Sequence, residues 1–126
     1  MNKNMRILIV DDYKTMLRVI GNLLRQLEFT HIDEALDGSE ALTKLRMAKY
    51  DLVISDWNME PMNGLDLLKQ VRADPKLSGI PFIMVTAESK TDNVIAAKQA
   101  GVSNYIVKPF NAETLGKKLS SVFANA

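Results

Sequence analysis

Hydrophobic residues in this chain gather in five short runs, separated by stretches with helical periodicity. The runs cover residues 7–10, 31–35, 52–54, 81–85 and 105–107. The first, third, fourth and fifth runs are nearly continuous and rich in Ile and Val, which is typical of parallel strands covered on both faces. The second run is more polar, and we therefore expect it to form an edge strand.

Between the runs, apolar residues recur every three or four positions, as on one side of an amphipathic helix. Asp37, Asn63 and Asn111 are candidate N-caps, Glu40 completes a capping box with Asp37, and Gly101 is a candidate helix end. The five predicted apolar stripes are Met16, Ile20, Leu23 and Leu27, flanked by Leu17 and Leu24; Ala41, Leu42 and Leu45; Leu65, Leu68 and Val71; Val94, Ile95, Ala97 and Ala100; and Leu115, Leu119 and Val122.

Strand and helix thus alternate five times along the chain. Such alternation indicates an α/β domain with right-handed crossovers and with helices on both faces of a parallel sheet. We find no linker, repeat or low-complexity segment in the 126 residues. We therefore expect residues 1–126 to form a single domain, and because the fifth helix uses up the chain, we expect no output domain.

The composition excludes several classes of chemistry. The chain has no Cys and only one His, His31, which excludes disulfides, thiolate metal sites, His-based metal clusters and a Ser-His-Asp triad. Its formal net charge of +1 makes nucleic acid and anionic membranes poor candidate partners. No apolar run has the length of a signal-peptide core or of a membrane span of about 20 residues. These features favour a cytoplasmic protein without membrane insertion.

Polar side chains follow four of the five predicted strands. Asp11 and Asp12 come directly after the first run, and Asp56 comes two residues after the third. Thr86 and Lys108 directly follow the fourth and fifth runs. The carboxyl ends of parallel strands meet at one edge of the sheet, where open α/β proteins bind ligands. We therefore expect these five side chains to lie close together.

Three carboxylates at one edge repel one another, by about 4 kcal/mol per pair at about 4 Å and an effective dielectric constant of about 20. A hard divalent cation relieves this repulsion, and ligation by oxygen atoms alone suits Mg²⁺. Lys108 is the natural partner of one carboxylate or of an anion bound to it, and Thr86 can donate a hydrogen bond. This set of groups favours phosphoryl transfer to an aspartate.

The same residues resemble the signature of the receiver domain of two-component response regulators, and the resemblance covers the whole chain. It implies a doubly wound, five-stranded parallel sheet of the flavodoxin-like (βα)₅ type with strand order 2-1-3-4-5. Within the family, the stretches at 54–59, 84–88, 96–101 and 107–110 resemble the single-domain chemotaxis regulators most closely. The signature positions are 11–12, 56, 86–87 and 108–109.

The resemblance also implies roles at the site. Asp56 would be the phosphoacceptor, receiving its phosphoryl group from a phosphohistidine on a CheA-type histidine kinase. Asp12 would bind Mg²⁺ directly, Asp11 would bind it through water, and the backbone carbonyl of Asn58 would add a ligand. Lys108 would pair with the acyl phosphate, and the peptide bond that follows it would be cis.

A switch and a partner surface follow from the same resemblance. Thr86 would move toward the phosphoryl group, and the ring of Tyr105 would then turn inward. Ser89, Tyr105, Val107 and Lys118 would form the face that binds the flagellar switch protein FliM. A dedicated phosphatase is a further candidate partner, and we expect a monomer.

The loop after Asp56 departs from the family pattern. Receivers usually have Asp-x-x-Met-Pro-x-Met-Asp-Gly, whereas residues 56–64 here place Glu60 at the usual proline position and shift the proline to Pro61. We predict a different loop shape, with Glu60 contributing to the metal site or competing for it. Asn63 replaces the usual Asp, which changes little because both residues cap helices well.

Several alternatives to a motor-binding switch remain at this stage. A phosphate sink or a phosphorelay intermediate would share the acidic pocket. A phosphatase of the haloacid-dehalogenase type would also use Asp, Thr, Lys and Mg²⁺, but it places Asp-x-Asp after its first strand and carries a cap insertion. Nucleotide or flavin binding would need Gly, Ser or Thr amides where this chain has two acids. The leading hypothesis is a protein that catalyses only its own phosphorylation and dephosphorylation.

Overall fold

The computed structural model describes residues 2–87 and 91–123, and its elements alternate between strand and helix as predicted. The strands are β1 (Arg6–Val10), β2 (His31–Ala35), β3 (Leu52–Asp56), β4 (Phe82–Thr86) and β5 (Asn104–Val107). The helices are α1 (Lys14–Gln26), α2 (Gly38–Met47), α3 (Gly64–Ala73), α4 (Thr91–Gln99) and α5 (Ala112–Phe123). Within these described ranges, each helix is too short or too polar to cross a lipid bilayer.

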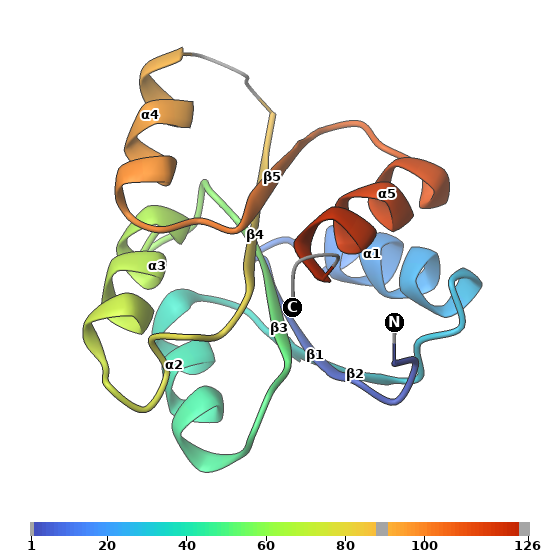
Figure 1. The fold of residues 1–126 in the computed structure, drawn as a ribbon, viewed down its shortest axis with the longest axis horizontal. Coiled ribbons are helices and arrows are strands. Elements are labelled where there is room, and N and C mark those ends of the chain that lie inside the picture. Colours follow the sequence, from blue (N-terminus) through green and yellow to red (C-terminus); the bar gives the residue numbers. More distant parts are fainter. Residues whose placement is uncertain (1, 88–90, 124–126) are drawn as a thin grey trace.

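The strands form one parallel sheet in the order β2-β1-β3-β4-β5, which confirms the doubly wound α/β fold. The polar strand β2 lies at an edge, as predicted. Figure 1 shows α1 and α5 on one face of the sheet and α2, α3 and α4 on the other. Both faces are therefore covered, as the continuous hydrophobic strands require.

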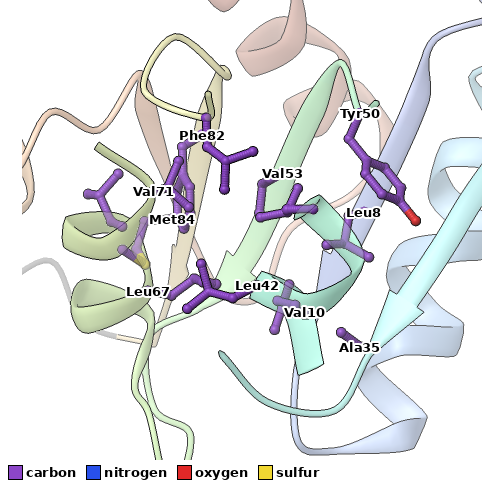
Figure 2. Packing of buried hydrophobic residues seen from close by; sticks show 14 of the residues in the cluster. Leu8, Val10, Ala35, Leu42, Tyr50, Val53, Leu67, Val71, Phe82 and Met84 are labelled. Atoms are coloured by element: carbon purple, nitrogen blue, oxygen red, sulfur yellow. The ribbon is translucent and has the colours of Figure 1, made fainter. Parts of the chain in front are cut away.

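Alternate residues of each central strand supply two separate hydrophobic cores. On β1, Ile7 and Ile9 belong to the core under α1 and α5, whereas Leu8 and Val10 belong to the core under α2 and α3. Figure 2 shows the second of these cores, in which the side chain of Leu42 lies close to those from the strands. The three central strands β1, β3 and β4 are thereby fixed from both sides, whereas the edge strands β2 and β5 are partly exposed.

The predicted helix stripes differ from the structure in three helices, one of them α4, where Ile95 is exposed. In α1 the residues with the least exposure are Leu17, Ile20, Gly21 and Leu24, while Met16, Leu23 and Leu27 are half-buried. Gly21 lies in the centre of the buried stripe, and because it has no side chain to mark a hydrophobic position, the sequence pattern did not reveal this stripe. In α3, Leu67 is buried and Leu65 is half-buried.

The predicted caps and helix end are confirmed. The Asp37 carboxylate accepts a hydrogen bond from the Glu40 amide at 2.9 Å. Asn63 and Asn111 accept bonds from amides three residues later, at 2.8 and 2.9 Å. Gly101 has a φ of +92°, a conformation that glycine adopts without strain. These local signals explain why the helices begin and end where they do.

The first residue of α3 packs directly onto the end of β3. A Cβ atom on Gly64 would lie 2.2 Å from the backbone oxygen of Asp56 and 2.8 Å from the sulfur of Met84. The Gly64 amide donates a hydrogen bond to the Trp57 carbonyl at 2.8 Å. Because the nearest obstacle is backbone, any larger residue must displace α3 or β3.

Substitution Gly64→Ala should therefore lower the free energy of unfolding by about 1–3 kcal/mol, the usual cost of overpacking. Urea denaturation followed by circular dichroism would measure it. Gly79→Ala is the matched control, because no atom lies within 4 Å of a Cβ built there, and it should change stability by less than about 0.5 kcal/mol. Equal stability of Gly64→Ala and the wild type would contradict the close approach of α3 to β3.

Candidate functional site

The register of the sheet brings the predicted polar residues to one edge. Val10 of β1 pairs with Ser55 of β3, so the next residues along, Asp11 and Asp56, are neighbours. At the other side of the site, the Lys108 amide donates a hydrogen bond to the Thr86 carbonyl at 2.8 Å. Asp56 and Thr86 are the last residues of β3 and β4, because these strands extend slightly beyond the predicted runs.

The three carboxylates form a group that can hold a metal ion. One oxygen from each of Asp11, Asp12 and Asp56 lies within 4.8 Å of the other two. Asp11 and Asp56 are buried, whereas Asp12 is exposed. The negative charge is therefore concentrated at the sheet edge, with Asp12 as its solvent-facing member.

One oxygen of this group has no hydrogen-bond partner among the described residues. Asp11 Oδ1 accepts a bond from the Tyr13 amide at 2.9 Å, while the buried Oδ2 accepts none. A buried carboxylate oxygen without a partner is costly. The residues present therefore fit a cation bound beside Asp11.

Lys108 is the cationic group of the site. Its Nζ lies 2.8 Å from Asp56 Oδ1 and 4.0 Å from Asp11 Oδ2. Its side chain is 24% exposed, so the ion pair with Asp56 lies at the boundary between the protein interior and solvent. One ammonium group faces three carboxylates, which leaves the site with a net negative charge.

Burial, more than this imbalance of charge, raises the pKa of Asp11. The pKa rises from 3.8 to about 6, and the negative charges of Asp56 and Asp12 add to the effect of burial. The hydrogen bond from the Tyr13 amide and the positive charge of Lys108 oppose the rise. At neutral pH, Asp11 is thus ionised at a cost to the folded state. A bound cation would remove that cost.

The predicted switch residues Thr86 and Tyr105 line one small cavity of about 10 Å³, between the sheet and α4. Trp57, which follows Asp56, lines the same cavity, together with Val94 and Ala97 of α4. The contribution of α4 to this cavity was not predicted from the sequence, because the helical stripe alone does not show which strand it covers.

The residues expected on the partner face lie near this cavity, apart from Ser89, which is outside the described residues. Tyr105, Val107 and Lys118 are each half-buried. The Lys118 Nζ lies 5.3 Å from the centre of the Tyr105 ring, within the range of a cation–π interaction. β5 and α5 thus present adjacent polar and aromatic groups.

The loop after β3 contains the other expected residues. Asn58 and Glu60 are exposed, and within the described part of the chain the carboxylate group does not include Glu60. The Lys108–Pro109 peptide bond is cis, as predicted, and the Glu60–Pro61 bond is also cis, which was not predicted.

Comparisons with known proteins agree with this geometry. The model of the response regulator receiver domain family matches residues 7–120. The chain is 54% identical to chemotaxis protein CheY-3 of Vibrio cholerae, covering 98% of this chain and 95% of that protein. It is 53% identical to chemotaxis protein CheY of Pseudomonas aeruginosa, covering 94% and 96%.

A solved structure is similar in fold as well. The structure of the chemotaxis response regulator CheY4 of Vibrio cholerae superposes with a TM-score of 0.87 at 35% identity, covering 95% of this chain and 99% of that one. Its fold is therefore shared over almost the full length of both chains. The chain belongs to the response regulator receiver domain family.

Proposed function

We propose that this protein is a chemotaxis response regulator that accepts a phosphoryl group on Asp56 from a CheA-type histidine kinase and then binds the flagellar switch protein FliM to control rotation. The observation that carries the proposal is the contact of 2.8 Å between Lys108 Nζ and Asp56 Oδ1 inside the carboxylate group. The identity of 53–54% to two chemotaxis proteins supports the same assignment. We place the protein in the cytoplasm as a single receiver domain over residues 1–126.

Mg²⁺ is the metal that we propose for this site. Asp11, Asp12, Asp56 and the backbone carbonyl of Asn58 would hold it, and a donor set made only of oxygen suits this ion. The buried Asp11 Oδ2 without a hydrogen-bond partner supports the assignment. When bound, Mg²⁺ supplies positive charge that neutralises the oxygens of the transferring phosphoryl group.

Three side chains contribute to the transfer: Asp56 accepts the phosphoryl group, and Lys108 and Thr86 donate hydrogen bonds to it. An Asp56 oxygen forms a bond to phosphorus while the bond between phosphorus and the histidine nitrogen of the kinase breaks, and the imidazole leaves with that electron pair. The Lys108 ammonium then donates to a phosphoryl oxygen, and the Thr86 hydroxyl donates to another. Because the product is the protein's own acyl phosphate, which it later helps to hydrolyse, it is no conventional turnover enzyme.

The cavity that Thr86 and Tyr105 share supports the proposed switch. Its volume of about 10 Å³ is too small for a phenol ring. Tyr105 can therefore turn inward only after Thr86 moves toward the phosphoryl group. This movement would change the surface that Tyr105, Val107, Lys118 and Ser89 offer to FliM.

The first test uses Trp57, the only tryptophan in the chain, which follows Asp56 and lines the switch cavity. Titration with Mg²⁺, and then with beryllofluoride, should give saturable fluorescence changes. The variant Asp56→Asn should lose the response to beryllofluoride. Asp92→Asn, an exposed acid in α4, is the control and should respond like the wild type. Absence of any response in the folded wild-type protein would contradict the phosphoacceptor assignment.

The raised pKa of Asp11 predicts a stability difference that depends on pH. The shift from 3.8 to about 6 means that the folded protein binds the proton more tightly, so stability is lost as pH rises through this range. In the absence of metal, Asp11→Asn should raise the free energy of unfolding at pH 7 by up to about 3 kcal/mol. At pH 3.5 the two proteins should be nearly equal.

Urea denaturation at the two pH values, with and without Mg²⁺, would measure this effect. Mg²⁺ should stabilise the wild type and have much less effect on Asp11→Asn. Asp12→Asn is the control, since its exposed side chain should contribute little to stability without metal. Lower stability of metal-free Asp11→Asn at pH 7 would show that the Asp11 charge is favourable in the folded protein.

Binding to the motor is tested separately. A peptide with the N-terminal sequence of FliM should bind the protein at least tenfold more tightly in the presence of Mg²⁺ and beryllofluoride, as measured by isothermal titration calorimetry. The variant Asp56→Asn should show no such increase. If beryllofluoride changes Trp57 fluorescence but not the affinity for FliM, the protein is instead a phosphate sink or a relay intermediate.

A further inference from the structure

A second cavity lies at the opposite end of the sheet from Asp56. It has a volume of about 620 Å³, within the range of small-molecule sites. Its lining comes from the end of α2, from the residues before β3 and from the connection between α3 and β4 (Figure 1). The apolar part of the lining consists of Leu45, Ala48, Tyr50, Leu77 and Ile80.

The connection that forms one wall is held by a half-buried arginine. Arg72 Nη1 donates hydrogen bonds to the carbonyls of Ser78 and Ile80, at 2.8 and 2.6 Å. Its Nε donates to the Gly101 carbonyl at 2.9 Å, which ties the connection to the loop before β5. Burial lowers the pKa of Arg72, yet a guanidinium stays charged at neutral pH. This wall is therefore preformed.

The Tyr50 ring, at the edge of the core in Figure 2, is fixed as well. Its hydroxyl donates to Asp33 Oδ2 at 2.6 Å, and the Arg6 guanidinium carbon lies 4.7 Å from the ring centre. Arg6 and Asp33 are themselves paired at 2.9 Å. The aromatic side of the cavity is thus held in place by partners outside the cavity.

The charges around the cavity are unbalanced. Asp74 accepts bonds from Arg46 Nε at 3.5 Å and from the Lys76 amide at 2.9 Å, so this carboxylate is already engaged. The ammonium groups of Lys49 and Lys76 have no carboxylate within 4.0 Å in the described part of the chain. Both lysines are exposed, and both also line a neighbouring hollow of about 520 Å³. Two positive charges therefore flank an apolar floor.

We propose that this cavity binds a small organic anion with an apolar body. An aromatic or branched aliphatic group would rest against Leu45, Leu77 and Ile80, and a carboxylate, sulfonate or phosphate group would lie between Lys49 and Lys76. Hydrogen bonds between such groups and ammonium are stronger than neutral ones, and fixed walls reduce the entropic cost of binding. This site needs neither Asp56 nor Lys108, so it goes beyond the proposed function.

The test is a titration of the ¹⁵N-labelled protein with naphthalene-2-sulfonate, followed by ¹H–¹⁵N correlation spectra. Saturable shifts should be concentrated at amides of residues 45–50 and 74–80. The double variant Lys49→Gln/Lys76→Gln should bind at least about tenfold more weakly, because it loses both charge-assisted hydrogen bonds to the sulfonate. The dispersion of the same spectra shows whether the variant is folded. Lys98→Gln, an exposed lysine of α4, is the matched control and should bind like the wild type.

Two further titrations show whether the charge of the ligand and the position of the cavity account for the binding. The neutral alcohol 2-naphthalenemethanol should bind at least about tenfold more weakly than the sulfonate. Asp56→Asn should bind the sulfonate like the wild type. The sulfonate titration therefore tests the cavity, the beryllofluoride response tests the proposed function, and either proposal can be contradicted without the other. The proposal is overturned by equal affinity for the neutral alcohol, by shifts centred on Trp57 or Tyr105, or by no saturable shift at millimolar sulfonate.

Discussion

The central constraint on this structure is an excess of negative charge held at the carboxyl edge of the sheet. Asp11 and Asp56 are buried there, Asp12 completes the group, and Lys108 is the cation that faces them. This arrangement is unfavourable by itself, and it persists because two hydrophobic cores fix the strands from both sides. The energy of the fold therefore holds together charges that would separate in water, which makes this edge a candidate site for a cation.

The surroundings of Asp56 are rigid on one side and adjustable on the other. Gly64 brings the start of α3 against the backbone of Asp56, so the loop side cannot give way. On the other side, Thr86, Trp57 and Tyr105 surround a small cavity under α4. We propose that a change at Asp56 is transmitted toward α4 and β5, where this cavity leaves side chains room to rearrange.

The sequence alone predicted the alternation of elements, the edge position of β2 and the five polar residues at the strand ends, since each of these follows from a local pattern. It could not predict which oxygen of Asp11 lacks a hydrogen-bond partner, because that depends on where the Tyr13 amide points. The shifted stripe of α1 was missed because Gly21 carries no side chain that marks a buried position. The cavity near Lys49 and Lys76 was missed for a different reason: it is built from connections that have no periodicity.

The Asp11 oxygen without a hydrogen-bond partner also has a consequence for the lifetime of the protein. A cation that binds only the folded state stabilises it by mass action, and the fraction of unfolded chains falls accordingly. Proteases degrade chains chiefly when these open. If Mg²⁺ occupies the site as proposed, the abundance of this protein in the cell will follow the concentration of free magnesium, even when no signal reaches Asp56.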